Sequence, residues 1–415
     1  MSSMNYLVLI LVFILSLPGC SLLQMKHDIG VLEQSVEVRG EVAGAATDKP
    51  VFVAHIRDNG GKLEIVNYSV QYGPGPFHFL MSPGTAFLFA FQDINENLIY
   101  EKGEPAAWYG GHAAKKIVVK QGELIDKLVI TLDTDTPEGV DEVARPERTS
   151  NNKVTIGQIK YSLGELIRLD DRRFTAKRGA QGLFKPVQSL NENGVGIYFL
   201  EPYDPAKVPV LFVHGAGGYA REFGPMIESM DHEKFQAWVL QYPSGLRLDI
   251  SSDIMTQALV ELYARYKFDR LAIVAHSMGG LVSRAAINKI ATRYPFNPIR
   301  MFITLSTPWD GVESARFGVE RSPLVVPCWI DIAPGSVFLT GLFKQPLPHS
   351  IRYYQLFGVV GGNGTDGAVP LTSVGSLRAQ ADSVRIFAYP ETHAGILKSN
   401  EAMRQVHALL ADVTS

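Results

Sequence analysis

The segment from Leu271 to Leu281, LAIVAHSMGGL, constrains the fold of this 415-residue chain more than any other. An apolar run is followed at once by a serine between small residues and then by a helix-like stretch. A buried strand that turns sharply into a helix raises the serine hydroxyl above the sheet and directs helix N–H groups toward it. Ala275 and Gly279, two positions before and after Ser277, suit the close backbone crossing at such a turn. The segment therefore predicts an exposed nucleophilic serine at a strand end.

Strand-like and helix-like segments alternate around this turn. The predicted strands are Val208–Val213, Ala237–Gln241, Leu271–Ala275, Met301–Leu305, Tyr354–Val360 and Val384–Tyr389. The predicted helices are Phe223–Met230, Ile250–Tyr266, Leu281–Tyr294 and Asn400–Leu410. Such alternation predicts a mostly parallel sheet with helices on both faces, in which functional groups gather at the carboxyl ends of the strands.

The N-terminal part has a different pattern. Between residues 31 and 133, short alternating apolar runs are separated by the turn sequences Asp58–Gly61, Gly73–Pro76 and Ser82–Gly84. This period of two predicts a separate, antiparallel, all-β sandwich domain. The stretch Pro83–Asn97, followed by Gly103–Pro105, resembles transthyretin-like and carboxypeptidase-regulatory-like sandwich domains.

Residues 134–152 are rich in Thr, Asp, Pro, Glu and Arg, which predicts a solvated linker. We expect an α/β domain over residues 153–415. Apolar residues at near-helical spacing between Ile156 and Ala176 predict a helix at its start.

The chain from Val187 to the C-terminus resembles the α/β-hydrolase fold, and its lipase-like branch in particular. The matching segments are His214–Gly218 (HGAGG), Ala275–Gly280 (AHSMGG), Ser306–Gly311 (STPWDG), Asp366–Pro370 (DGAVP) and His393. A serine of this kind attacks a carbonyl only if a base accepts its proton and an acid orients the base. The fold supplies these groups in the order Ser, Asp or Glu, His.

Asp366 follows the strand that ends at Val360, and His393 follows the strand Val384–Tyr389, so both lie at strand ends. We therefore expect Ser277, Asp366 and His393 to form a catalytic triad. The rival acids are Asp310, Asp331 and Glu391, and the other histidines are His349, His407 and His276.

His349 is placed comparably to His393 and stays an alternative base, and His407 lies in the middle of a predicted helix. The other rivals have a simpler structural interpretation. The neighbours of Asp310 resemble a structural turn of the family, Asp331 lies in a cap, and Glu391 belongs to a loop surface. His276 is expected to pack under the turn.

An acyl-transfer intermediate carries a negatively charged oxygen that needs prepositioned donors. The backbone N–H of Met278, directly after the nucleophile, is one such donor, and the resemblance implies that the N–H of Ala216 is the second. Residues 312–352 are rich in proline and aromatic residues, which predicts a cap insertion that favours an acyl chain over a sugar or peptide. The cap is either a mobile lid or a packed element.

Residues 1–20 predict an export signal. The apolar run Tyr6–Leu17 ends in LPGC and is shorter than the ~20 residues of a membrane span, so it suits a secretion signal. The LPGC sequence resembles the lipobox of bacterial lipoproteins, which implies that Cys20 carries a fatty-acyl group such as palmitate. The residue after it, Ser21, resembles the pattern of proteins sent to the outer membrane. The alternative is an uncleaved anchor.

If Cys20 is acylated, Cys328 is left without a disulfide partner. It is expected to be a half-buried apolar residue.

A calcium loop is a further possibility in the N-terminal domain. Hard oxygen ligands recur at Asp93, Asn95, Asn97, Glu101 and Glu104. Because Leu98 occupies the position where such a loop needs glycine, a long polar hairpin is the preferred interpretation.

Together these features predict a cofactor-independent lipase or esterase that forms an acyl-enzyme on acyl-ester or lipid substrates at the cell envelope. Two alternatives remain open: a non-catalytic envelope binding protein, and an acyltransferase with the same triad. The sequence indicates no partner for the β-sandwich. The net charge of −3 and the lack of a basic block interleaved with aromatics exclude a nucleic-acid partner.

Overall fold

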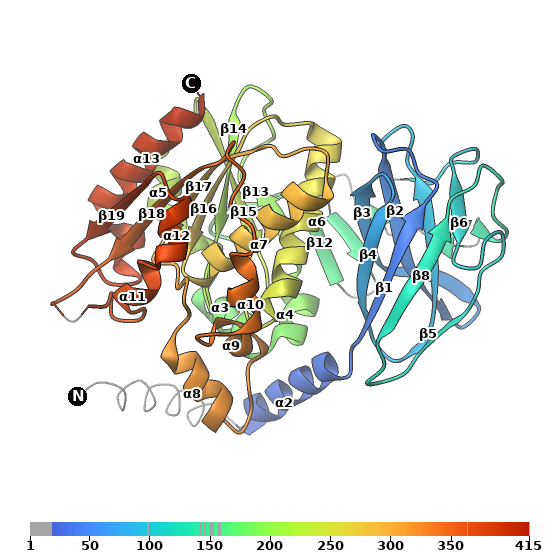
Figure 1. The fold of residues 1–415 in the computed structure, drawn as a ribbon, viewed down its shortest axis with the longest axis horizontal. Coiled ribbons are helices and arrows are strands. Elements are labelled where there is room, and N and C mark those ends of the chain that lie inside the picture. Colours follow the sequence, from blue (N-terminus) through green and yellow to red (C-terminus); the bar gives the residue numbers. More distant parts are fainter. Residues whose placement is uncertain are drawn as a thin grey trace.

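A computed structural model of the chain describes residues 19–97, 99–140, 143–144, 147–148, 153–156, 159–362 and 364–414. The predicted signal therefore lies almost wholly outside the described residues. Figure 1 shows a β-rich half and an α/β half side by side, with helix α2 (Gly19–Glu33) leading into the β-rich half. No helix among the described residues is both long and apolar enough to cross a membrane.

The β-rich half consists of two facing sheets. Its strands are β1 (Val36–Ala43), β2 (Pro50–Asn59), β3 (Lys62–Tyr72), β4 (Gly75–Met81), β5 (Gly84–Gln92), β6 (Ala106–Trp108), β7 (Ile117–Val119), β8 (Ile125–Thr131) and β9 (Val143–Ala144). One sheet has the order β4-β1-β8, and the other has the order β6-β5-β2-β3-β9 with β7 paired to β5. Alternate residues of β5 separate into two apolar clusters: Ala86, Leu88 and Ala90 pack between the sheets, whereas the phenylalanines face the other way.

The prediction of a wholly antiparallel sandwich is wrong within residues 31–133 where β1 meets β8, and the short strand β9 that follows also pairs with β3 in parallel. β1 pairs with β8 in parallel, for example Val42 with Ile130. Parallel neighbours need a long connection instead of a hairpin. Here the intervening strands β2–β7 supply it, and no local turn signal reports such a pairing.

The α/β half is built on one ten-stranded sheet in the order β10-β11-β12-β13-β15-β14-β16-β17-β18-β19. These strands are β10 (Glu147–Arg148), β11 (Lys153–Ile156), β12 (Ile159–Leu166), β13 (Val195–Phe199), β14 (Val208–Val213), β15 (Phe235–Gln241), β16 (Leu271–His276), β17 (Ile299–Leu305), β18 (Arg352–Gly358) and β19 (Arg385–Tyr389). The run from β15 through β19 is parallel throughout, which confirms the predicted parallel sheet.

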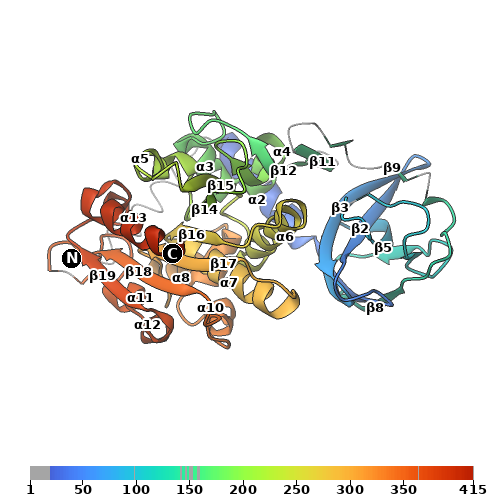
Figure 2. The ribbon, with the colours of Figure 1, turned by 90° about the horizontal axis from the view of Figure 1, so that it is seen from above.

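The helices of this half are α3 (Ala176–Phe184), α4 (Pro186–Asn193), η2 (Ala220–Phe223), α5 (Gly224–Glu228), α6 (Leu248–Tyr266), α7 (Met278–Arg293), α8 (Glu313–Arg321), α9 (Pro327–Ile332), α10 (Val337–Leu342), α11 (Leu371–Val374), α12 (Leu377–Asp382), η3 (Gly395–Lys398) and α13 (Asn400–Thr414). Two apolar clusters place α6 and α7 on one face of the sheet and α5 and α13 on the other. Figure 2 shows that α6 is the helix nearest to the β-sandwich.

The helix predicted between Ile156 and Ala176 is wrong, because β12 runs through residues 159–166 of this range and the next helix, α3, begins only at Ala176. Gly164 has a φ of +87°, and a Cβ there would lie 2.8 Å from the ring of Phe199. A left-handed residue against a neighbouring strand does not fit an α-helix. The predicted linker contains two short strands, β9, which pairs with β3, and β10, which pairs with β11.

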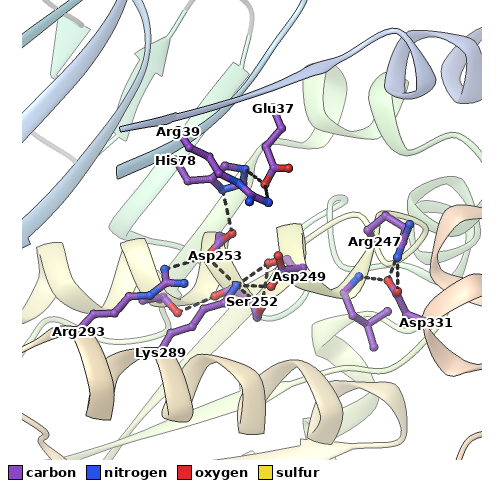
Figure 3. Close-up of polar contacts among 12 residues, drawn as sticks. Glu37, Arg39, His78, Arg247, Asp249, Ser252, Asp253, Lys289, Arg293 and Asp331 are labelled. Carbon is purple, nitrogen blue, oxygen red and sulfur yellow. Dashed lines mark hydrogen bonds and ion pairs between the residues drawn. The ribbon is translucent and has the colours of Figure 1, made fainter. Parts of the chain in front are cut away.

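The predicted cap contains α8, α9 and α10, and side chains from the core hold it. Asp331 on α9 accepts hydrogen bonds from the guanidinium of Arg247 and from the backbone N–H of Leu248, so it caps the start of α6 (Figure 3). Cys328 is fully buried instead of half-buried as expected, and this burial raises the pKa of its thiol.

Candidate functional site

The serine turn forms where the sequence predicts it. β16 ends at His276, and α7 begins at Met278, so Ser277 occupies the corner with a φ of +55°. A non-glycine residue with positive φ is strained and persists only where the surrounding structure enforces it. Close packing does so here: a Cβ on Gly279 would lie 2.5 Å from two backbone oxygens, and a Cβ on Gly215 would lie 2.7 Å from the Cβ of Ser277.

A histidine and an aspartate converge on this serine. His393, in the loop after β19, has its Nε2 2.9 Å from Ser277 Oγ. Its Nδ1 lies 2.7 Å from Oδ2 of Asp366, which is in the loop after β18. The structure thus brings all three predicted side chains together from separate strand ends. An ionised carboxylate can only accept, so Nδ1 carries the proton, and Nε2 is left to accept from the serine hydroxyl.

The aspartate is fixed by its backbone as well as by the imidazole. The other carboxylate oxygen of Asp366 accepts hydrogen bonds from the N–H groups of Ala368 at 2.9 Å and Val369 at 2.7 Å. Burial alone would raise the pKa of Asp366, but the hydrogen bond and charge of His393 and these two N–H donors hold the pKa below its ordinary value. The side chain is therefore an anion at neutral pH although it is fully buried.

Two other histidines support the site but form no part of the hydrogen-bonded chain Ser277–His393–Asp366. His276 donates from Nε2 to the backbone oxygen of His393 at 2.9 Å, and His214 stacks on Tyr242 with ring centroids 4.5 Å apart. Burial, with the neighbouring charge of His393, lowers the pKa of His276 to about 3, and burial lowers that of His214 to about 4. Both rings are neutral at physiological pH, so they add no charge beside His393.

The two expected oxyanion donors belong to the two segments that meet at the serine, the start of α7 and the turn after β14. Met278 is the first residue of α7, where a helix N–H has no acceptor one turn earlier. Ala216 is exposed in the turn after β14, next to Gly215, which contacts Ser277. The turn is held by a residue that the sequence analysis missed: the buried Ser244 accepts from the N–H of Gly217 at 2.9 Å. The only signal for it is its place directly after β15, at the same edge of the sheet.

Glu222 is a second residue that the sequence analysis missed. It lies in η2, and its carboxylate accepts from the N–H of Tyr219. Burial raises the pKa of Glu222, while the nearby His393 opposes that rise. Its place four residues after the HGAGG turn is visible in the sequence, but its proximity to His393 appears only in the structure.

The rival residues lie elsewhere. Asp310 pairs with Arg378 at the surface, Asp331 caps α6, and His407 bonds the backbone oxygen of Met226. Neither Asp310 nor Asp331 hydrogen-bonds to a histidine of the described chain.

The oxygen-rich loop of the β-sandwich bonds mainly to itself. Asp93 accepts from the N–H of Asn97, Asn95 donates to Glu101, and Glu104 accepts from the N–H groups of Ile94 and Glu101. This is the pattern of a polar hairpin. Over the part of the chain that the structure describes, no group of three or more His, Cys, Asp or Glu side chains is arranged to hold a metal ion.

One family model matches part of the chain. Residues 248–329 match the family model described as "Putative serine esterase (DUF676)". The match runs from α6 through the Ser277 turn to α9 and stops before Asp366 and His393. The chain has an α/β-hydrolase-like fold. The family match supports an ester hydrolase; no curated protein sequence matches the chain significantly.

Several solved structures are similar to parts of the chain. Bacillus licheniformis lipase BlEst2 in mature form has 22% sequence identity and a TM-score of 0.42, covering 52% of this chain and 97% of that one. Aspergillus fumigatus lipase B has 17% identity and a TM-score of 0.40, covering 65% and 62%. Phospholipase PlaB from Legionella pneumophila has 16% identity and a TM-score of 0.35, covering 40% and 45%.

Proposed function

We propose that the protein is a serine carboxylic-ester hydrolase in which Ser277, His393 and Asp366 act as a catalytic triad on acyl-ester or lipid substrates. The observation that carries the proposal is the continuous chain of hydrogen bonds from Ser277 Oγ through the imidazole of His393 to Asp366, at 2.9 and 2.7 Å. Such a chain at a strained strand-to-helix turn activates a hydroxyl that is otherwise a weak nucleophile.

The reaction has two halves. Ser277 Oγ bonds to the ester carbonyl carbon while Nε2 of His393 takes the hydroxyl proton, and the N–H groups of Met278 and Ala216 stabilise the resulting oxyanion. The intermediate collapses, the C–O bond to the alcohol breaks, and His393 returns the proton to the leaving oxygen. Water then attacks the acyl-serine with His393 as base, which releases a carboxylic acid and restores the hydroxyl.

Exposed apolar side chains on the cap helices support an acyl substrate. Val337 on α10 is 89% exposed, and Ile330 on α9 is 40% exposed. Apolar side chains exposed on a cap favour a substrate with a hydrocarbon chain over a sugar or a peptide.

The proposed location is the cell envelope, with a fatty-acyl group on Cys20 at the start of the mature chain. The LPGC sequence supports this part of the proposal. Cys20→Ser should release the protein from isolated membranes into the soluble fraction. Membrane retention of this variant at the wild-type level would contradict acylation.

A panel of p-nitrophenyl esters of increasing chain length tests the activity. Wild-type protein should hydrolyse them, Ser277→Ala should not, and Ser229→Ala, which changes an exposed serine, should match wild type. Equal rates for wild type and Ser277→Ala would refute the proposal. A product that is mainly acylated alcohol instead of free acid would assign the same triad to an acyltransferase.

A further inference from the structure

A cavity of about 700 Å³ lies between the β-sandwich and the α/β half. Its walls come from β2, β3 and β4 on one side and from α4, α6 and the end of α7 on the other. The sandwich is open here because β4 is an edge strand, and because the described residues of β9 pair with Leu63 and Glu64 at the start of β3 and not with its later residues. Ser277 directly precedes the first residue of α7, whereas Thr292, which lines the cavity, lies near its last residue. About 22 Å of helix separates the two residues. The cavity is therefore separate from the proposed catalytic site.

Unpartnered polar groups line the sandwich side of this cavity. His55 on β2 is only 3% exposed, and no group in the described part of the chain hydrogen-bonds to either of its ring nitrogens. The same is true of Ser69 Oγ and Arg57 Nε. Leaving one such group buried and unpaired costs about 1–3 kcal/mol. Three residues of this kind at one cavity indicate a site that a polar ligand completes.

The backbone register explains why these groups gather. His55 has the same orientation on β2 as Val53, which pairs with Ser69 and packs between the sheets. The ring of Phe79, from β4, is 6.1 Å from that of His55. The imidazole and the hydroxyl thus face inward at the open edge of the sandwich.

The charges around the cavity are unequal. Asp253 on α6 is the one carboxylate among the described residues that line it, and it already lies 2.6 Å from Lys289, 3.8 Å from Arg293 and 3.7 Å from His78. Figure 3 shows these groups converging on Asp253 from both halves. Arg57, in contrast, forms no ion pair with any described residue; its guanidinium donates to the backbone oxygen of Ser82. On the side of the cavity next to His55, no carboxylate of a described lining residue pairs with Arg57.

The remaining walls are largely apolar. They include the side chains of Phe77, Phe79, Leu80, Tyr161, Ile250 and Ile254. A cavity of several hundred Å³ with apolar walls and a few convergent polar groups is the usual form of a small-molecule site.

We propose that this cavity binds an amphiphile with an anionic head group, such as a carboxylate or a phosphate monoester. The head lies against His55, Arg57 and Ser69, and the hydrocarbon chain lies against the apolar walls. A fatty acid is one such molecule, and it is also the product of the proposed ester hydrolysis.

The protonation of His55 is consistent with this ligand. Burial and the charge of Arg57 lower the pKa of His55 to about 3, so the ring is neutral and offers one N–H donor at neutral pH. Apart from His55 and Arg57, the described titratable or charged side chains on the cavity wall are His78, Asp253, Arg293 and the tyrosines Tyr68, Tyr72, Tyr161 and Tyr294. A bound anion would favour the protonated ring and so raise the pKa of His55.

Calorimetric titration of the full-length chain that carries Cys20→Ser and Ser277→Ala tests the proposal. The first substitution removes the proposed acylation site, and the second removes turnover. Decanoate or decyl phosphate should bind with a stoichiometry near one, and at least tenfold more tightly than decanol or decyltrimethylammonium. Both His55→Phe and Arg57→Met should weaken that binding at least tenfold. His112→Leu, which changes an exposed sandwich histidine, should leave it unchanged.

A spectroscopic measurement separates binding at this cavity from binding elsewhere. In a sample with ¹⁵N-labelled histidine, saturation with decanoate should raise the pKa of His55. Four results would overturn the proposal: an unmoved His55 resonance, equal affinity for decanoate and decanol, undiminished binding in both variants, or no binding of either anionic amphiphile. Because no step requires hydrolysis, failure of the proposed activity would leave this result unaffected.

Discussion

Asp366→Asn tests the chain of hydrogen bonds from Ser277 through His393 to Asp366, because it changes one atom of the side chain and hardly changes its shape. The asparagine oxygen can keep the two hydrogen bonds from the N–H groups of Ala368 and Val369, so the loop should hold. Its amide nitrogen then faces Nδ1 of His393, where the carboxylate oxygen lay at 2.7 Å. A donor at that position favours the tautomer with its proton on Nε2, and such a nitrogen cannot accept the proton of Ser277.

The expected loss in kcat is about 10⁴-fold, which corresponds to about 5.4 kcal/mol of transition-state stabilisation. Initial rates on a p-nitrophenyl ester, measured with matched thermal unfolding curves, give this number. Asp310→Asn is the control because Asp310 pairs only with Arg378 at the surface, and it should change kcat less than twofold. An Asp366→Asn rate within tenfold of wild type, or an equal loss in the control, would refute the reasoning.

The remaining predictions concern stability. Gly279→Val should destabilise the fold by about 1–3 kcal/mol in urea unfolding, because its Cβ would lie 2.5 Å from two backbone oxygens; an unchanged midpoint would contradict the packing at the turn. Asp331→Ala should lower the free energy of unfolding by about 1–2 kcal/mol, since the start of α6 loses its cap and an ion pair with the half-exposed Arg247. A decrease of less than about 0.3 kcal/mol would contradict this role of Asp331. Burial lowers the pKa values of the three histidines His55, His214 and His276. The unfolded chain therefore binds protons first, and the free energy of unfolding should fall as the pH is lowered from 6.5 toward 4. His55→Phe should reduce the slope of this free energy against pH by about 1.4 kcal/mol per pH unit, and an unaltered slope would show that His55 titrates normally.

The parts of the site that the sequence predicts are those with local causes. The turn at Ser277 needs small residues at fixed offsets, so the pattern around it is visible in a dozen residues. Asp366 and His393 could be selected because each directly follows an apolar strand, and parallel strands end at one edge of the sheet. The contacts that hold Asp366, from the N–H groups two and three residues later, are not visible in side-chain identities.

The features that the sequence does not predict depend on distant contacts. Apolar residues in β12 recur at a spacing that also suits a helix, and only pairing with β13 decides between the two. The parallel pairing of β1 with β8 likewise depends on strands that are far apart in the chain. His55 looks like an ordinary sheet histidine, because the cavity that it faces is formed by two halves of the protein.

The most direct test of the central claim is to identify the residue that a fluorophosphonate modifies, by mass spectrometry of peptides from the labelled protein. The account predicts one adduct, on the hydroxyl of Ser277, and none in His393→Ala under the same conditions. An adduct on any other residue, or undiminished labelling when His393 is replaced, would contradict it.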